Sequence, residues 1–280
     1  MIYTKISHRE AKQFYFSSGI AVELSENSTY NIDMSLKDFF DVNSKFALAF
    51  SGGVDSAYLL CEAVKAGVNV RAYFVRSEFQ PEFELEDARR LAENMGAKLV
   101  QLNLSVTDDE LIMSNPADRC YHCKRRIMGA IKEAALADGY ELLVDGTNAS
   151  DDSDDRPGMR AQAELGIRSP LRECGITKDE VRRGAREMGL DIWDKPSYAC
   201  LATRVPHGER ITEAKLRGTE KAEGILYDMG FRDFRVRWRG HDALVQVKAD
   251  QINEAFARGA EIKTALGKIY DMVRIDDEPR

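Results

Sequence analysis

Ser51–Ser56, with the sequence SGGVDS, is the stretch of this 280-residue chain whose residue types point most directly to chemistry. It follows an apolar run at Phe46–Phe50 and precedes a helical pattern over Ala57–Val64, so a strand is expected to turn into a helix here. Gly52 and Gly53 have no side chains, so backbone N–H groups can approach an anion closely, and the helix adds its positive dipole end. The stretch therefore predicts a phosphate-binding loop.

Polar side chains complete this loop. The hydroxyls of Ser51 and Ser56 are natural donors to phosphate oxygens, and Asp55 can reach a magnesium ion that screens the phosphate charge. The loop lacks the lysine of a Walker A motif, and it is not a G-x-G-x-x-G fingerprint. A structural turn with a serine cap needs only one of these residues, so we favour nucleotide binding. The nucleotide-binding residues predicted from the loop are Ser51, Gly52, Gly53, Val54, Asp55 and Ser56.

Three of the five cysteines have a spacing that suggests sulfur or metal chemistry rather than a disulfide framework. Cys120 and Cys123 form a C-x-x-C at the expected start of a helix, where the dipole favours thiolates, and Cys200 lies in an irregular stretch. Three thiolates can bind a 4Fe-4S cluster through three irons and leave the fourth iron free for a ligand such as hydrosulfide. We favour this interpretation, and a metal-free dithiol or persulfide site and a zinc site with His122 stay open.

Arginines supply candidate anion-binding groups in the second half of the chain. Arg235 and Arg237 alternate in a predicted strand and so point to one side, and Arg239 continues the row. Together with Arg204 they are candidates for holding the phosphate or carboxylates of a substrate, because guanidinium groups pair bidentately with both. An ordinary exposed strand face is the alternative.

The segments around the loop and the C-x-x-C alternate between strand and helix patterns. This alternation predicts right-handed β-α-β crossovers and a parallel sheet, with ligands at the carboxyl ends of the strands. Gly146 follows the fourth strand and is predicted to contact the nucleotide at the same edge. The expected strands are Phe46–Phe50, Val68–Val75, Ala97–Asn103 and Glu141–Asp145, and the expected helices are Glu82–Met95, Cys120–Ala137 and a capped helix from Thr177 to about Met188.

The pattern changes beyond Val205. Its order of elements suggests a small α+β domain. We therefore predict an α/β domain with a parallel sheet over residues 1–205, including an N-terminal extension, and a small α+β domain for substrate binding or oligomerisation over residues 206–280. The expected elements are helices at Glu213–Met229 and Asp250–Leu266 and strands at Phe231–Trp238, Ala243–Val247 and Tyr270–Ile275.

The net charge and the hydropathy of the chain limit the classes of partner that it is expected to bind. A formal net charge of −7 argues against broad nucleic-acid binding and favours a small-molecule substrate. No apolar run is long enough to cross a bilayer, so we expect a cytoplasmic protein with no membrane partner. The acidic loop Ser150–Asp155 is expected to be a solvated linker, with magnesium coordination beside the phosphates as the alternative.

Ser51–Ser56 matches every fixed position of the S-G-G-x-D-S signature of the PP-loop ATP pyrophosphatases, which cleave ATP between the α and β phosphates and leave an adenylated substrate. From about Ser44 onward the chain resembles the LarE family of ATP-dependent sulfur transferases within that class. The order of the matching pieces carries the resemblance, and they are Ser51–Ser56, Ser77–Glu78, Asp145–Gly146, Arg156–Gly158, Arg168–Ser169, Ala199–Arg204, Pro206, Gly208 and Arg235–Arg237.

The resemblance implies that sulfur is inserted into a pyridinium-3,5-dicarboxylate mononucleotide, on the way to the nickel-pincer nucleotide cofactor. Adenylation of a carboxylate would give a mixed anhydride, from which sulfur displaces AMP. The implied cofactors are ATP, Mg²⁺ and a 4Fe-4S cluster, the implied assembly is a homo-oligomer, and the source of sulfide is not indicated. Ser77 is implied at the nucleotide, and Glu223 joins Arg204, Arg235 and Arg237 at the substrate.

The family has two versions. One sacrifices the sulfur of a single cysteine in the segment matching Ala199–Arg204, and the other resembles this chain, with a cluster that carries a removable sulfide. Cys200 is offset by one position from the sacrificial cysteine, which falls at Ala199, so the cluster version is favoured here. The predicted catalytic residues are Asp55, Cys120, Cys123 and Cys200.

Three other functions stay open. The tRNA thiolases are also similar in the PP-loop, the C-x-x-C and a distant third cysteine, but the acidic balance of this chain argues against tRNA. An amide ligase like the GMP or NAD synthetases would use ammonia and would not need the three cysteines. A nucleotide sensor would not need a second reactive centre.

Overall fold

The computed structural model describes residues 14–15, 21–22, 34–151 and 156–280. The chain separates into two units, Met1–Met34 and Ser35–Arg280. In the first unit the strands β1 (Phe14–Tyr15) and β2 (Ala21–Val22) pair in antiparallel fashion. Most of the predicted N-terminal extension and residues 152–155 of the acidic loop lie outside the described residues.

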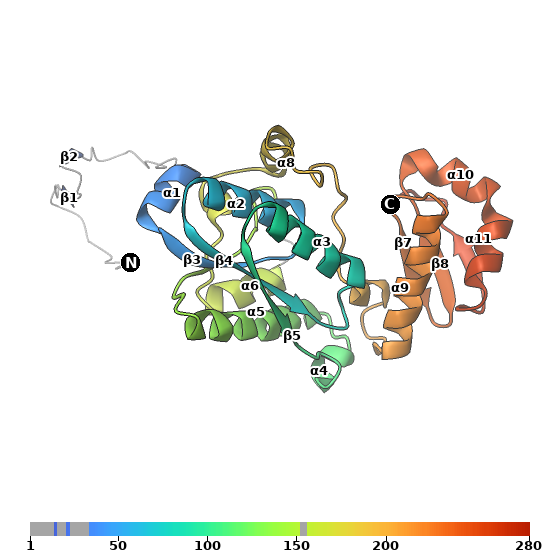
Figure 1. Ribbon diagram of the computed structural model, residues 1–280. Coiled ribbons are helices and arrows are strands. Elements are labelled where there is room, and N and C mark those ends of the chain that lie inside the picture. Colours follow the sequence, from blue (N-terminus) through green and yellow to red (C-terminus); the bar gives the residue numbers. More distant parts are fainter. Residues whose placement is uncertain (1–13, 16–20, 23–33, 152–155) are drawn as a thin grey trace, which may run out of the picture. The chain divides into compact units, whose positions relative to one another are not determined.

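A four-stranded parallel sheet forms the centre of the Ser35–Arg280 unit, in the order β5-β4-β3-β6 (Figure 1). It confirms the predicted α/β fold. Arg168 bridges to Val144 in parallel fashion and extends the sheet at its β6 edge. The strands are apolar on both faces because helices cover both, and they are β3 (Lys45–Ala49), β4 (Asn69–Arg76), β5 (Lys98–Asn103) and β6 (Leu143–Val144).

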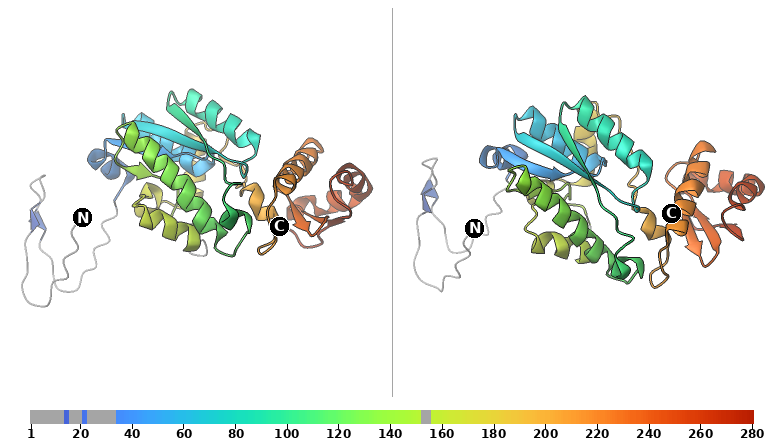
Figure 2. Two further views of the ribbon diagram at one scale, coloured as in Figure 1. Left: turned by 90° about the horizontal axis from the view of Figure 1, so that it is seen from below. Right: turned by 60° about the horizontal axis from the view of Figure 1, so that its bottom comes forward.

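The helices form two layers. Figures 1 and 2 show α2 and α3 on one face of the sheet and α5 with α6 on the other. A further helix, α8, packs against α2, where Gly184 leaves room for the ring of Tyr58. The helices of this part are α1 (Leu36–Val42), α2 (Val54–Lys65), α3 (Glu82–Asn94), α4 (Glu110–Met113), α5 (Arg119–Ala137), α6 (Arg156–Glu164), α7 (Pro170–Glu173) and α8 (Lys178–Glu187).

The strand order reverses between β3 and β6, and this reversal creates the crevice where ligands bind in open parallel sheets. The predicted phosphate loop follows β3, and Gly146 follows β6, so the reversal brings the two together. A Cβ atom on Gly146 would lie only 2.7 Å from the backbone nitrogen of Ser56 and 2.9 Å from its Cα. Only glycine lets the β6 loop approach the first turn of α2 so closely.

A second, three-stranded sheet follows, with β7 antiparallel to β8 and β8 parallel to β9. Helix α9 packs against β7 and α11 packs against β9. A short 3-10 helix, η2 (Leu201–Arg204), leads into this part. Its other elements are α9 (Glu213–Asp228), β7 (Arg235–Arg239), β8 (Asp242–Gln246), the 3-10 helix η3 (Ala249–Gln251), α10 (Ile252–Ala257), α11 (Gly259–Leu266) and β9 (Val273–Ile275).

Two predictions for this part were wrong in detail. The strand predicted from Phe231 begins only at Arg235, because the backbone N–H of Phe231 closes the end of α9 on the Leu226 carbonyl and Asp233 adopts a left-handed φ of 52°. The single helix predicted over Asp250–Leu266 is divided into η3, α10 and α11, with a break at Arg258.

One cluster of buried apolar residues includes residues next to the parallel sheet and residues of the second sheet with its helix α9. Phe79 and Val106, from the loops after β4 and β5, belong to the same buried cluster as Leu216 of α9 and Val236 of β7. The domain boundary predicted between residues 205 and 206 therefore stays a prediction. Among the helices of the described residues, none combines the length and the apolar character that a membrane span requires.

We predict that Gly146→Ala lowers the free energy of unfolding by about 1–3 kcal/mol, because the added methyl forces the backbone at Ser56 to move. Gly129→Ala in α5 is the control, since a Cβ there meets nothing within 4 Å and alanine favours a helix by about 1 kcal/mol. Urea unfolding measures both. An unchanged midpoint for Gly146→Ala would contradict the close approach.

Candidate active site

Hydrogen bonds within the phosphate loop fix its conformation. Gly52 has a left-handed φ of 73°, and a Cβ there would lie 3.3 Å from Ala88 of α3, so glycine is required for both conformation and space. The hydroxyls of Ser51 and Ser56 lie 3.3 Å apart, and the Ser56 hydroxyl donates to the Gly53 carbonyl at 3.1 Å. The two hydroxyls therefore face each other across the loop.

Asp55, in the first turn of α2, has a partner on each carboxylate oxygen. Asn148 lies in the loop after β6, and its amide donates to Oδ1 of Asp55 at 3.1 Å. The Lys178 ammonium lies 2.5 Å from Oδ2. Lys178 is the first residue of α8 and was missed in the sequence analysis. The one local indication is the position of Lys178 at a helix N-terminus. A cation there opposes the helix dipole, so it is unusual at this place.

Asp145 shapes the loop beside Asn148. This carboxylate is buried, and it accepts hydrogen bonds from the Thr147 backbone at 3.1 Å and from the Ser169 hydroxyl at 2.7 Å, and it also bonds the Gln162 amide. Burial raises the pKa of Asp145 above its usual range. Its hydrogen bonds fix the turn that carries Gly146 and Asn148 to the phosphate loop.

Ser77 lies at the carboxyl end of β4 in a different setting. Its hydroxyl donates to Gln80 at 2.5 Å, and the residue is buried. It lines a polar cavity of about 480 Å³ together with Asn103, at the end of β5, and Arg217 of α9. The structure therefore places Ser77 at the sheet edge predicted for the nucleotide, and no residue of the Ser51–Ser56 loop lines that cavity.

The three candidate cysteines come from two segments. Cys120 and Cys123 lie in the first two turns of α5, and Cys200 directly precedes η2. Cys123 and Cys200 pack against the same buried apolar cluster. Burial raises the pKa of Cys123 to about 12, with further contributions from Cys200 and Cys120. Burial also raises the pKa of Cys200, and Cys120 adds to that shift.

A buried arginine stands beside these thiols. Arg119 is 2% exposed, and it donates to the Asn115 side chain at 2.7 Å, to the Ala202 carbonyl at 3.1 Å and to the Cys120 sulfur at 3.6 Å. Among the described residues it forms no ion pair. Its charge therefore faces the thiols without a carboxylate to neutralise it.

Asn115 connects the C-x-x-C helix to the segment after Cys200. It is 0% exposed, has a left-handed φ of 58°, and donates from its amide to the carbonyls of Val205, Pro206 and Glu209. No local sequence pattern indicates this role, because the acceptors lie about ninety residues further along the chain. Asn115 and Arg119 together hold the two cysteine segments side by side.

The three thiols suit a 4Fe-4S cluster in their chemistry. Within the described residues, no group of three His, Cys, Asp or Glu side chains is arranged to hold a single metal ion. A cluster does not require that arrangement, because each cysteine binds a different iron. Cys120, Cys123 and Cys200 supply the thiolate chemistry that such a cluster uses, and the cluster itself stays a prediction.

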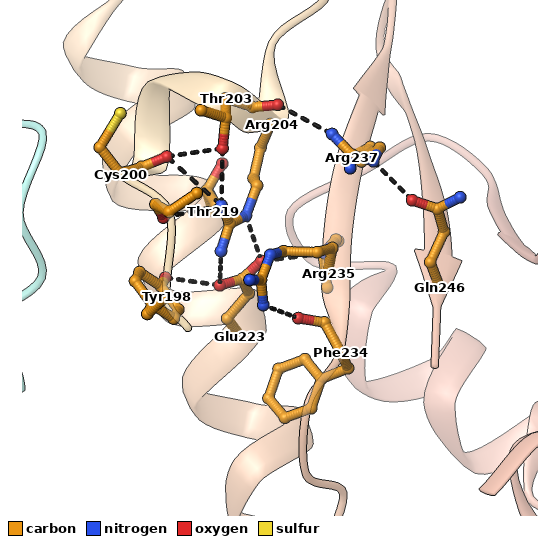
Figure 3. Close-up of polar contacts among 12 residues, drawn as sticks. Tyr198, Cys200, Thr203, Arg204, Thr219, Glu223, Phe234, Arg235, Arg237 and Gln246 are labelled. Carbon is orange, nitrogen blue, oxygen red and sulfur yellow. Dashed lines mark hydrogen bonds and ion pairs between the residues drawn. The ribbon is translucent and has the colours of Figure 1, made fainter. Parts of the chain in front are cut away.

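Arg204 and Glu223 form a buried ion pair (Figure 3). The Arg204 guanidinium is 1% exposed and contacts the Glu223 carboxylate twice, at 2.7 and 3.0 Å. Its remaining nitrogen donates to the carbonyls of Ala199 and Cys200 and to the Thr203 hydroxyl. Glu223 also accepts hydrogen bonds from Tyr198 and from the Val236 backbone. The pair thus fastens the Cys200 segment to α9 and β7, and its predicted role in substrate binding stays a prediction.

Arg235 and Arg237 both contact the segment from Ser197 to Thr203. Arg235 is 4% exposed and donates to the carbonyls of Phe234 and Ser197, and Arg237 donates to Gln246 and to the Thr203 carbonyl (Figure 3). Neither forms an ion pair with a described residue. Burial lowers the pKa of Arg235 to about 10, with the nearby Arg204 charge contributing, and the same two causes lower the pKa of Arg237.

Two cavities adjoin these arginines. One of about 380 Å³ is lined by Thr203, Arg204, Pro206, Arg237 and Arg239, and its three guanidinium groups favour an anion. The other, of about 670 Å³, is lined on one side by Tyr198, Glu223 and Arg235.

We predict that Glu223→Gln lowers the free energy of unfolding by about 3 kcal/mol, because it leaves the buried Arg204 charge without its counter-ion. Glu213→Gln is the control on the same helix, since its ion pair with Arg217 is exposed and such pairs contribute little. Equal urea midpoints for the two variants would contradict the structural role of the buried pair.

We also predict that Asn115→Gly lowers the free energy of unfolding by about 3 kcal/mol, because it leaves buried carbonyls without a donor, and that Asn115→Ala lowers it by about 1–2 kcal/mol more. Glycine tolerates the left-handed backbone and alanine does not, so the difference between the two variants isolates the backbone strain. If only the alanine variant is destabilised in urea, the side-chain hydrogen bonds are not what joins the two segments.

Comparisons with known proteins give relatives along most of the chain, although no protein-family model matches it. An uncharacterised protein of Synechocystis sp. is 38% identical over 223 residues, which cover 79% of this chain and 82% of that protein. The pyridinium-3,5-bisthiocarboxylic acid mononucleotide synthase of Lactiplantibacillus plantarum is 32% identical over 222 residues, or 79% of each chain. A tRNA-specific 2-thiouridylase MnmA of Frankia alni is 31% identical over 53% of this chain and 52% of its own length. The identity to the synthase extends over more than two thirds of both chains, so this protein belongs to the LarE-type family of pyridinium-3,5-bisthiocarboxylic acid mononucleotide synthases.

Proposed function

We propose that this chain is an ATP-dependent sulfur transferase that replaces a carboxylate oxygen of pyridinium-3,5-dicarboxylate mononucleotide with sulfur. The observation that carries the proposal is the SGGVDS loop at the reversal of strand order, in a chain of this family. The name of the Lactiplantibacillus plantarum relative supports the choice of substrate, because its product is a bisthiocarboxylic acid mononucleotide.

The first step activates the substrate. A carboxylate oxygen attacks the α phosphorus of ATP, the bond to the β phosphate breaks, and pyrophosphate leaves behind an acyl adenylate. We assign the β and γ phosphates to the backbone and hydroxyls of Ser51–Ser56, where the N-terminus of α2 favours negative charge. Asp55 would hold the Mg²⁺ that screens these phosphates. Arg235 and Arg237, which lack carboxylate partners among the described residues, would hold the substrate's anionic groups.

The second step transfers sulfur. A soft sulfur nucleophile attacks the activated carbonyl carbon, the bond to the AMP oxygen breaks, and the products are a thiocarboxylate and AMP. Cys120, Cys123 and Cys200 would hold a 4Fe-4S cluster, and when bound this group supplies sulfide from the iron that carries no cysteine. Arg119 would stabilise the negative charge of the sulfur ligands, since it donates to the Cys120 sulfur.

The second candidate is thiolation of tRNA, favoured by the partial identity to a 2-thiouridylase. It uses the same adenylation step, but a net charge of −7 disfavours a large polyanionic substrate. An ammonia-using amide ligase has no use for the three thiols. A homo-oligomeric assembly and a cytoplasmic location stay predictions from the sequence.

The test is sulfur transfer by reconstituted protein. The protein is incubated without oxygen with ATP, Mg²⁺, sulfide and either the pyridinium mononucleotide or bulk tRNA, and mass spectrometry shows which one gains sulfur. We expect the mononucleotide to gain sulfur and AMP to be released. Sulfur in tRNA alone would replace the proposal with the second candidate.

Cysteine variants test the sulfur site separately. Cys120→Ala, Cys123→Ala and Cys200→Ala should each lose visible cluster absorbance and sulfur transfer while still releasing pyrophosphate in the adenylation step. Cys61→Ala and Cys174→Ala are the matched controls, because these cysteines lie outside the three-thiol group. Full sulfur transfer by any of the first three variants would contradict the assignment.

A further inference from the structure

The Lys178–Asp55 ion pair is the feature of the phosphate side that the proposed mechanism leaves unused. The ammonium lies 2.5 Å from the carboxylate, and the two side chains are only 25% and 23% exposed. The two residues are 123 positions apart, so the fold rather than local sequence brings them together. A pair this close and this shielded is stronger than an exposed surface pair.

The backbone at Lys178 is fixed from several directions. The hydroxyl and carboxylate of the Thr177–Glu180 capping box close the first turn of α8. The Lys178 N–H donates to the Ser150 hydroxyl at 3.0 Å, and the Ala149 N–H donates to the Ile176 carbonyl at 2.8 Å. The start of α8 is therefore anchored to the loop after β6, and only the flexible lysine side chain is free to change partners.

This placement is unfavourable for the helix itself. A lysine in the first turn of α8 puts a positive charge at the positive end of the helix dipole, where acidic residues are preferred. Asp179 and Glu180 follow that preference, and Lys178 does not. Helix stability therefore does not explain why a lysine stands at position 178.

The six residues of the phosphate loop contain no cationic side chain. Ser51–Ser56 offers backbone N–H groups, two hydroxyls and one carboxylate, whereas a Walker A loop carries a lysine for the β and γ phosphates. Both oxygens of Asp55 are occupied in this state, by Asn148 and Lys178. A magnesium ion bound at Oδ2 would lie beside the Lys178 ammonium, and the repulsion between the two cations favours departure of the ammonium.

We propose that Lys178 is the phosphate-binding lysine of this site and that it exchanges partners when Mg²⁺-ATP binds. Its ammonium leaves Asp55 for an oxygen of the β or γ phosphate, and the freed Asp55 oxygen binds Mg²⁺. The inference rests on the proposed nucleotide site. Each charge keeps an opposite charge beside it throughout, so the exchange avoids leaving a shielded charge unpaired.

The exchange predicts that Lys178 affects the binding of pyrophosphate and not the binding of AMP. Lys178 contacts the pyrophosphate part of the nucleotide and not its adenosine or α phosphate. Losing the ammonium should therefore weaken pyrophosphate binding and spare AMP binding.

The experiment is calorimetric titration of the full chain with magnesium pyrophosphate and, separately, with AMP. Lys178→Met should weaken pyrophosphate binding at least tenfold, and Lys178→Arg, which keeps the charge, should weaken it less. Lys195→Met is the matched control, because Lys195 lies 2.5 Å from Asp87 and the pair is 24% and 26% exposed. AMP binding should be unchanged in all three variants.

The outcomes separate this inference from the proposed function. If Lys178→Met binds pyrophosphate as tightly as the wild type, the inference fails and the nucleotide site stands. If Lys178→Met loses AMP as well, or Lys195→Met weakens pyrophosphate equally, the ion pair is structural and the inference also fails. If the wild type binds no pyrophosphate, the phosphate site fails and the proposed function fails with it. Should the methionine variant not fold, Lys178→Gln replaces it under the same criteria.

Discussion

Burial of the Arg204–Glu223 pair is the constraint on which the sulfur side of the site depends. Two charges removed from water cost several kcal/mol each unless their geometry is satisfied, and here every oxygen and nitrogen has a partner. Those partners include the backbone carbonyls of Ala199 and Cys200. The segment carrying Cys200 therefore cannot move away from α9 and β7 without exposing the pair. The position of the third thiol is thus set by electrostatics rather than by the thiol itself.

Asn115 and Arg119 hold the segment of that thiol, Cys200, next to the helix that carries the C-x-x-C motif. Asn115 holds the carbonyls after η2, and Arg119 holds the Ala202 carbonyl inside it. The Cys200 segment is consequently fixed from both sides, with one set of bonds from α9 and β7 and another from the start of α5. Bonds of this kind orient the ligands of an inorganic group before the group arrives.

Local pattern predicted the parallel sheet and the SGGVDS loop, because apolar runs between helical segments and paired glycines are local features. It failed at Phe231–Phe234, where alternating apolar and basic residues look like a strand but a left-handed Asp233 delays β7. It also missed Lys178 and Asn115, whose partners lie far along the chain. The roles of such residues depend on which helices and strands pack together, and a short stretch of sequence does not contain that information.

The two halves of the site use different cations for a physical reason. Arg119 and Arg235 bond backbone carbonyls through rigid, planar guanidinium groups, so their charge stays in one place. Lys178 carries a compact ammonium on a flexible stem and pairs with a side chain, Asp55, that has a second use. In the proposed mechanism nucleotide would enter and pyrophosphate would leave in every turnover, whereas the sulfur ligands would remain in register with the substrate. Exchangeable charge suits the first task, and fixed charge suits the second.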